Sequence, residues 1–162
     1  MHKRITVLTA AVAAALVALV AVAVATGSSG HRVRVVRTAK NAKLGTTVLV
    51  TAKGRTLYSL SAERKGTFIC VDMSCLSFWH PLVVPAGATP AGSPGLGTVK
   101  RPDGRRQVTF RGGPLYTFSG DHARGDAKGE GFKDVGTWHA AATGGNASSP
   151  APAPTSGGGY RY

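Results

Sequence analysis

The sequence predicts a small, mostly β single domain built from two tandem repeats that each contain a β-hairpin, with little helix outside a hydrophobic N-terminal segment. Three observations predict this fold class. Residues 54–60 recur as residues 112–118 in the pattern Gly-x-x-Leu-Tyr-[Ser/Thr]-[Leu/Phe], an offset of 58 residues. Short runs of β-branched and aromatic residues alternate with glycine-containing turns. No segment beyond the N-terminal one shows sustained helical periodicity.

The register of the duplication extends past the tyrosines. An acidic residue stands three positions after each repeated segment, at Glu63 and at Asp121. A Trp-His pair also recurs, at residues 79–80 and 138–139, with an offset of 59 that needs one inserted residue. We therefore expect two copies of one structural unit.

Each copy contains the pattern of a β-hairpin. Residues 47–51 and 56–60 flank the turn sequence Ala-Lys-Gly-Arg, and residues 107–110 and 114–118 flank Arg-Gly-Gly. Glycine at such a turn accepts a positive φ, which hairpin turns commonly require. Strand, turn, strand is the predicted order in both copies.

Two further strands are expected upstream of these hairpins. Residues 97–100 precede an Arg-Pro-Asp-Gly turn, in which proline presets one turn angle and Asp-Gly accepts the next. By analogy, residues 33–37 should form an outer strand that leads into the first copy, with its arginines on the solvent face. We expect at most one short helical turn, around the cysteines within residues 66–76.

Length and composition set the domain organisation. The chain has 162 residues, and its two ends leave roughly 100 residues for one small core. The C-terminal end is rich in Gly, Ser, Ala and Pro and buries too little apolar surface to offset its ordering entropy. The predicted parts are residues 1–25 (signal peptide or signal anchor), 26–43 (basic linker that can include an edge strand), 44–142 (duplicated β domain, with copies at about 44–84 and 96–142) and 143–162 (disordered tail).

The N-terminal segment indicates export. A short basic head precedes an apolar run over residues 5–25, which ends in Ala23-Val-Ala25, a small-x-small pattern that signal peptidase accepts. Two interpretations stay open: cleavage after Ala25, or retention as a signal anchor, because the run is also about long enough to span a bilayer. Both place the domain outside the cytoplasm, either secreted or membrane-anchored.

The charge of the chain favours anionic partners. The formal net charge is +13, and a basic cluster follows the hydrophobic segment. Such a cluster can bind an anionic membrane surface or cell-wall polymer, or it can be a solvated stalk. Specific nucleic-acid binding is not expected, because neither a basic face interleaved with aromatics nor a reading helix is present. The cluster comprises Arg32, Arg34, Arg37, Lys40 and Lys43.

The sequence has two cysteines, Cys70 and Cys75, and both lie in the exported part. In an oxidising compartment a close pair of cysteines most simply forms a disulfide. Because the loop is short, the bond should fix local geometry more than it stabilises the whole fold.

A metal or haem site is the alternative for this region. Soft ligands of the kind that a copper or haem site uses lie within one short stretch. They are Cys70, Met73, Cys75 and His80. A disulfide does not coordinate as thiolates do, so we predict no cofactor. A second metal hypothesis has His80 and His139 converge on one ion across a pseudo-two-fold axis, against ordinary packing or surface roles for both.

Several short motifs follow one another between residues 33 and 142. They are Leu44-Gly45, Gly54-Arg-Thr-Leu-Tyr58, Cys70 and Cys75 before Trp79 and Pro81-Leu82, Arg101-Pro-Asp-Gly104 with Gln107, Pro114-Leu-Tyr-Thr-Phe118-Ser-Gly-Asp121, Gly129-x-Gly131 and Gly136-Thr-Trp-His139. In this succession the chain resembles a bacterial family of secreted repeats, predicted lipoproteins of unassigned function that carry a Tyr-x-[Phe/Trp/Tyr]-x-x-Asp motif. The resemblance implies export and paired repeats, and it supplies no reaction.

The chain departs from that family at three places. The first copy has Leu60 and Glu63 where the motif has an aromatic residue and aspartate, so a site that needs this pair should lie in the second copy. Family members often show Trp-Pro-Pro-Leu where residues 79–82 are Trp-His-Pro-Leu. No cysteine stands near the signal cleavage point, so a lipid-modified N-terminus of the bacterial lipoprotein type is not expected.

The densest group of candidate functional residues is Tyr116, Phe118, Asp121 and His122. In the structural interpretation, the two rings share one face of a strand and fill the core, while Asp121 caps the next turn. In the functional interpretation, Asp121 and His122 are the polar ends of a ligand pocket with Tyr116 as a wall. The full set of family-motif and candidate ligand-facing residues is Tyr58, Glu63, Tyr116, Phe118, Asp121, His122, Trp79, Trp138 and His139.

Catalysis finds little support in the sequence. No Gly-x-Ser-x-Gly elbow, His-Glu-x-x-His motif or phosphate-binding Gly-rich loop is present, and the seven acidic residues are scattered. The sequence therefore predicts an exported cell-envelope protein that acts as a non-catalytic binding or interaction module. The alternative is a redox or metal/haem-binding accessory protein of the envelope.

Overall fold

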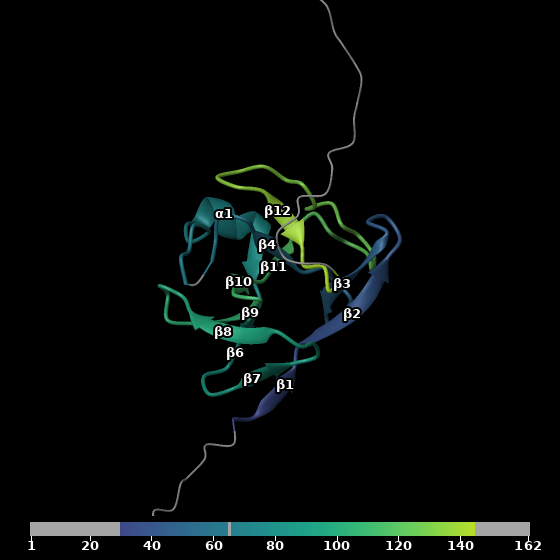
Figure 1. Cartoon of the computed structure of the whole chain (residues 1–162). Helices are drawn as coiled ribbons and strands as arrows, with labels where there is room; N and C mark the ends of the chain where they lie inside the picture. The colour runs from purple at the N-terminus through teal and green to yellow at the C-terminus, as the bar shows by residue number, and fades with distance from the viewer. Residues whose placement is uncertain (1–29, 65, 145–162) are drawn as a thin grey trace, which may run out of the picture.

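The structure, a computed structural model, describes residues 30–64 and 66–144. This part of the chain is mostly β, as the sequence predicted, with one short helix (Figure 1). The predicted export segment and nearly all of the predicted tail lie outside the described residues. The elements are β1 (Arg32–Arg34), β2 (Val36–Asn41), β3 (Thr46–Thr51), β4 (Tyr58–Leu60), α1 (Met73–Phe78), β5 (Trp79–Pro81), β6 (Val83–Val84), β7 (Thr89–Ala91), β8 (Leu96–Lys100), β9 (Arg106–Phe110), β10 (Gly113–Pro114), β11 (Tyr116–Phe118) and β12 (Trp138–Ala140).

Each copy opens with an antiparallel hairpin. β2 pairs with β3 from Val36 to Asn41, and β8 pairs with β9 from Leu96 to Lys100. The second hairpin turns through the predicted Pro-Asp-Gly sequence, where Gly104 has a φ of 84° that suits glycine. β2 is the counterpart of β8, so the duplicated unit takes in residues that the sequence analysis assigned to the basic linker. Among the described residues, α1 is the single helix, and no helix there has the length and hydrophobicity of a membrane span.

The two copies exchange strands. β4 and β11, which carry the duplicated tyrosines, pair antiparallel with Tyr58 opposite Tyr116. The Trp-His strand of the first copy, β5, pairs with β11 of the second copy, while β12 of the second copy pairs with β4 of the first. The resulting sheet has the order β12-β4-β11-β5, and a pseudo-two-fold axis passes between its two central strands.

The exchange continues beyond this sheet. β6, at the end of the first copy, pairs with β9 of the second copy through Val83 and Gln107. At the equivalent place, Ala142 of the second copy bridges to Val48 in β3 of the first. Each copy therefore lacks part of its own sheet, and the two copies form one interlocked domain. In Figure 1, β4 and β11 lie centrally, with β2 and β3 on one side and β8 and β9 below.

The interior consists of an aliphatic and an aromatic cluster. In the aromatic cluster, Trp79 and Trp138 stack with ring centroids 3.7 Å apart and planes 6° apart. Tyr58 and Tyr116 each meet the tryptophan of their own copy edge-on, at centroid distances of 5.5 and 5.1 Å, an arrangement that aromatic quadrupoles favour. The aliphatic cluster comprises Val36, Leu49, Leu57, Val84, Ala88, Val108, Leu115 and Ala141.

The predicted disulfide between Cys70 and Cys75 is present. It lies beside α1, whose N-cap residue Asp72 accepts a hydrogen bond from the Cys75 N–H at 3.0 Å. The helix begins within the expected range of residues 66–76 and ends two residues beyond it; none of its side chains is fully buried, and Cys75 and Leu76 are partly buried against the aromatic cluster. Cys70, by contrast, packs in the aromatic cluster. A helix this short is only marginally stable by itself. The disulfide therefore links it covalently to the core.

Alanine at Trp79 or Trp138 should destabilise the domain strongly. The two residues are 2% and 0% exposed, and truncation of a buried tryptophan costs roughly 3 to 5 kcal/mol. Denaturant unfolding of the exported protein measures the loss. Phe78→Ala, which removes an exposed ring of α1, is the control and should cost less than about 0.5 kcal/mol. Losses below about 1 kcal/mol for both tryptophan variants would rule out the stacked core.

Candidate functional site

Two tyrosine–carboxylate pairs cross between the copies at the centre of the domain. The Tyr58 hydroxyl donates to Oδ2 of Asp121 at 2.7 Å, and the Tyr116 hydroxyl donates to Oε2 of Glu63 at 2.8 Å. The tyrosines are equivalent positions, as are the two acids, so the pseudo-two-fold axis relates the pairs. All four residues are at most 1% exposed.

The other oxygen of each carboxylate holds a loop of its own copy. Oε1 of Glu63 accepts from the backbone N–H groups of Ile69 and Cys70, both at 2.7 Å. Oδ1 of Asp121 accepts from the N–H of Lys128, the counterpart of Ile69, at 3.0 Å. A buried carboxylate is tolerated when hydrogen bonds satisfy it. Each acid therefore binds its own copy with one oxygen and the other copy with the second.

The environment keeps both tyrosines protonated. Burial, followed by the hydrogen bond to Asp121, raises the pKa of the Tyr58 hydroxyl above its ordinary value of 10.0. Burial, followed by the charge of Glu63, raises the pKa of the Tyr116 hydroxyl in the same direction. Both hydroxyls are thus donors, and neither serves as a base or nucleophile at neutral pH. With both oxygens of each acid occupied, this cluster joins the two copies rather than moving protons.

A buried arginine that the sequence analysis read only as part of a turn joins this cluster. Nη1 of Arg101 donates to Oε1 of Gln107 at 2.5 Å and to the Tyr116 hydroxyl at 3.2 Å. Nη2 donates to the carbonyl of Cys70 at 2.9 Å. The Arg101 side chain is 1% exposed, which is rare for arginine. Gln107, a polar residue within a strand pattern of core positions, is the signal that could have revealed it.

The remaining candidate residues lie outside the crossed pairs. Phe118 is partly buried against Trp79, with ring centroids 4.5 Å apart. His122 is exposed on the loop that follows β11. Nδ1 of His139 lies 2.9 Å from Oε1 of Glu130 at a partly buried position. His122 was expected to lie with Tyr116 and Asp121. The side chains of Tyr116 and Asp121 are buried, whereas His122 is exposed, so the structure separates them.

The candidate metal ligands do not come together. His80 and His139 lie on the outer strands of the four-stranded sheet, each directly after a buried tryptophan. Because successive side chains of a strand face opposite sides, both histidines face away from the aromatic cluster. Met73 is 81% exposed, and the two cysteines are bonded to each other and offer no thiolate. Within residues 30–64 and 66–144, no group of three or more His, Cys, Asp or Glu side chains could hold a metal ion.

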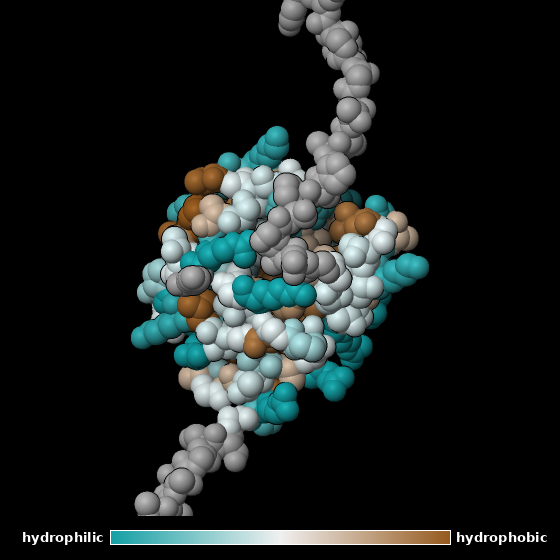
Figure 2. Space-filling view, viewed as in Figure 1, coloured by the Kyte–Doolittle hydropathy of each residue, from teal (hydrophilic) through white to brown (hydrophobic). Residues whose placement is uncertain are grey.

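The acidic and basic side chains are used differently. Six of the seven acidic residues accept hydrogen bonds from donors of the chain itself; they are Glu63, Asp72, Asp103, Asp121, Asp126 and Glu130. By contrast, four cations of β1 and β2 are exposed, and within the described part of the chain no hydrogen bond or ion pair engages their side chains. We call this group the basic edge; it comprises Arg32, Arg34, Arg37 and Lys40. The face of the molecule drawn in Figure 2 carries hydrophilic side chains around small, separate apolar patches.

Residues 97–142 match a family model described as a secreted repeat of unknown function. The match runs through the second copy, from β8 to Ala142, and confirms the resemblance found in the sequence. It also supports an extracytoplasmic location for the domain. No curated protein and no solved structure matches the chain.

The crossed pairs predict a loss of stability in alkali. An unfolded tyrosine ionises near pH 10, whereas Tyr58 and Tyr116 keep their protons to higher pH in the folded state. Stability from this source is complete below pH 10 and falls as the pH rises above it, by up to about 1.4 kcal/mol per pH unit for each tyrosine. Denaturant unfolding at several alkaline pH values measures the slope.

Phenylalanine variants isolate this effect. Tyr58→Phe and Tyr116→Phe should each cost about 1 to 3 kcal/mol at neutral pH, because a buried carboxylate loses a donor. Above pH 10 each variant should also lose stability less steeply than the parent protein. An unchanged alkaline slope in the double variant would show that the tyrosine protons are not held by the fold.

Proposed function

Since the chain carries a secreted repeat of unknown function in residues 97–142, we propose that it works outside the cytoplasm as a non-catalytic module that binds anionic material of the cell envelope. The observation that carries this proposal is the unequal use of charge. Six of the seven carboxylates accept hydrogen bonds within the fold, while within residues 30–64 and 66–144 no hydrogen bond or ion pair engages the side chains of the basic edge. A protein of net charge +13 thus presents cations to its surroundings without nearby acids to neutralise them.

The geometry of the basic edge suits an extended polyanion or a charged surface. Arg32 and Arg34 are alternate residues of β1, and alternate side chains of a strand lie about 7 Å apart on the same side. On β2, Arg37 and Lys40 lie three residues apart and therefore project from opposite faces, so the basic edge presents cations to two sides. Several cations in a line bind a repeating anion through many weak contacts, and salt screens such contacts strongly.

The central cluster supports the non-catalytic part of the proposal. The buried acids have both oxygens occupied, and the tyrosines keep their protons. A general acid or base must reach a substrate with a proton to give or take. In the crossed pairs, neither the carboxylates nor the tyrosine hydroxyls are free to exchange a proton with a substrate.

Retention on envelope material tests the proposal. The exported protein should co-sediment with purified cell wall or with vesicles that contain anionic lipid at low ionic strength, and release as salt is added. Arg32→Gln combined with Arg34→Gln should weaken retention about thirtyfold, since each cation near an anionic surface contributes about 1 kcal/mol.

A matched variant controls for charge alone. Arg64→Gln combined with Lys133→Gln removes the same charge from exposed positions outside β1 and β2 and should have a smaller effect. Equal losses in the two double variants would show that total charge, and not the basic edge, governs retention. Absence of retention on both materials at low salt would refute the proposed function.

A further inference from the structure

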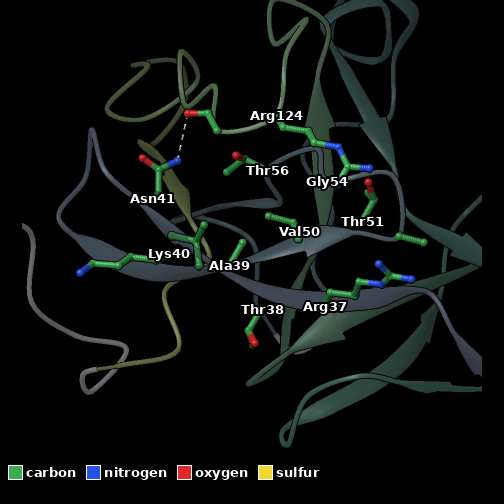
Figure 3. A pocket seen from close by; sticks show the side chains of 13 residues that line it. Arg37, Thr38, Ala39, Lys40, Asn41, Val50, Thr51, Gly54, Thr56 and Arg124 are labelled. Atoms are coloured by element: carbon green, nitrogen blue, oxygen red, sulfur yellow. Dashed lines mark hydrogen bonds between the residues drawn. The ribbon is translucent and has the colours of Figure 1, made fainter.

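A pocket of about 430 Å³ opens between the β2–β3 hairpin and the loop that follows β11 (Figure 3). On the hairpin side it is lined by Ala39 of β2 and by Val48 and Val50 of β3. Arg124 and Gly125 line it from the loop. Its volume falls in the range of pockets that hold small ligands. The hairpin side combines this apolar wall with polar lining residues, which are Arg37, Thr38, Lys40, Asn41 and Thr51.

Two arginines face this space from opposite sides. Arg37 pairs with Val50 in the hairpin register and shares the pocket face with Ala39, because side chains alternate along β2. Arg124 extends from the loop toward Gly54 and Thr51 (Figure 3). Figure 3 also shows Lys40 pointing away from the two arginines.

Gly54 makes room for Arg124. A Cβ atom at this position would lie 3.0 Å from Cγ of Arg124, and Gly54 has a φ of 85°, so both space and backbone conformation call for glycine. The loop itself is tied to the hairpin: Asn41 Nδ2 donates to the carbonyl of Gly125 at 3.3 Å, and Thr56 Oγ1 donates to the carbonyl of Asp126 at 2.5 Å. The pocket walls are therefore held in place without a ligand.

No carboxylate lines the pocket. The nearest acid in the sequence of the loop is Asp126, whose carboxylate accepts from the N–H groups of Ala123 and His122 and pairs with Lys43 at 3.2 Å. Those contacts lower the pKa of the Asp126 carboxyl, the Ala123 N–H most strongly, and its charge is satisfied within its own loop. The guanidinium groups of Arg37 and Arg124 have no hydrogen bond or ion pair in the described part of the chain.

The equivalent hairpin of the second copy carries a longer side chain at its junction with the loop. There Arg101 follows β8 and its side chain reaches Gln107 and the loop carbonyl of Cys70. By register the first copy has Asn41 in place of Arg101 and Val48 in place of Gln107. Asn41 makes the equivalent contact from hairpin to loop with a shorter side chain, and Val48 and Asn41 both line the pocket.

We propose that this pocket binds an oxyanion, a carboxylate or a phosphate, carried on a body of about the size of one sugar. Arg37 and Arg124 hold the anion, since two guanidinium groups offer forked donors that match its oxygens. The Thr51 hydroxyl lies at the same end (Figure 3), and the apolar wall receives the body of the ligand. The inference rests on the proposed function and deepens it, because it gives one anionic unit of an envelope polymer a discrete binding site that shares Arg37 with the basic edge.

Titration of the exported protein with small soluble probes tests this inference. Glycerol 3-phosphate and glucuronate are the two anionic probes, and glycerol and glucose are their neutral counterparts. At least one anion should cause saturable shifts of the Thr51 and Gly54 amide resonances, and the neutral compounds should cause none. Comparison of the two anionic probes shows whether the pocket prefers phosphate or carboxylate.

Variants distinguish the pocket from the basic edge. Arg124→Gln and Arg37→Gln should each weaken probe binding about tenfold or more, as loss of a charge-assisted contact requires. Arg124→Lys, which keeps the charge and loses the fork, should also weaken it. Arg32→Gln removes a cation of the basic edge outside the pocket and should leave probe affinity unchanged. Unaltered thermal unfolding of each variant excludes a folding defect, because both arginines are exposed.

The outcomes separate the two proposals. Saturable anion binding that depends on Arg37 and Arg124 supports the pocket even if the protein fails to sediment with envelope material, a result that would refute the proposed function alone. Retention on envelope material without saturable binding of either probe overturns the pocket. Equal losses for Arg124→Gln and Arg32→Gln also overturn it, since they would reflect net charge.

Discussion

The hydrogen bond from each tyrosine to the carboxylate of the other copy is the interaction on which the rest of this structure depends. A carboxylate is costly to bury unless donors surround it, and here the donors come from two places at once. Glu63 and Asp121 take backbone N–H groups from their own loops and a hydroxyl from across the pseudo-two-fold axis. The arrangement requires β4 and β11 to lie side by side. Their outer edges are then available to β5 and β12, whose tryptophans stack on each other and meet the tyrosines edge-on.

The same use of acids shapes the surface. Because acidic side chains serve inside the fold or within their own turns, the exposed cations of β1 and β2 are left without internal partners. This separation of charge arises because the fold uses its carboxylates as hydrogen-bond acceptors. A fold that recruits its carboxylates as structural acceptors leaves an excess of one sign facing outward.

Much of the local structure could be predicted from the sequence. The hairpin through the Pro-Asp-Gly turn, the disulfide and the equivalence of the two Leu-Tyr segments follow from sequence patterns. The two hairpins predicted around Gly54 and Gly112 are present only next to their turns, as the Val50–Thr56 bridge and the β9–β10 pair, because β4 and β11 pair with each other instead. The exchange of strands could not be predicted, because alternation shows which face of a strand is buried and says nothing of which strand lies beside it. The strand predicted over residues 33–37 is divided between β1 and the start of β2, and the rest of β2 extends further into the predicted linker. The buried position of Arg101 and the pocket both arise from contacts between a hairpin and a loop far away in the sequence. Neighbouring residues in the sequence do not indicate such contacts.

The exchanged strands also bear on what a chain with only one repeat could do. Such a chain would hold a tyrosine with no acid opposite it and a tryptophan strand with no neighbour to join. It could complete the same contacts only by associating with an identical molecule, in a self-complementary homodimer. Fusing two repeats in one polypeptide makes that assembly independent of concentration, and it frees the halves to diverge. Here one half places the long Arg101 side chain at its hairpin–loop junction, and the other has the shorter Asn41 there and a pocket beside it.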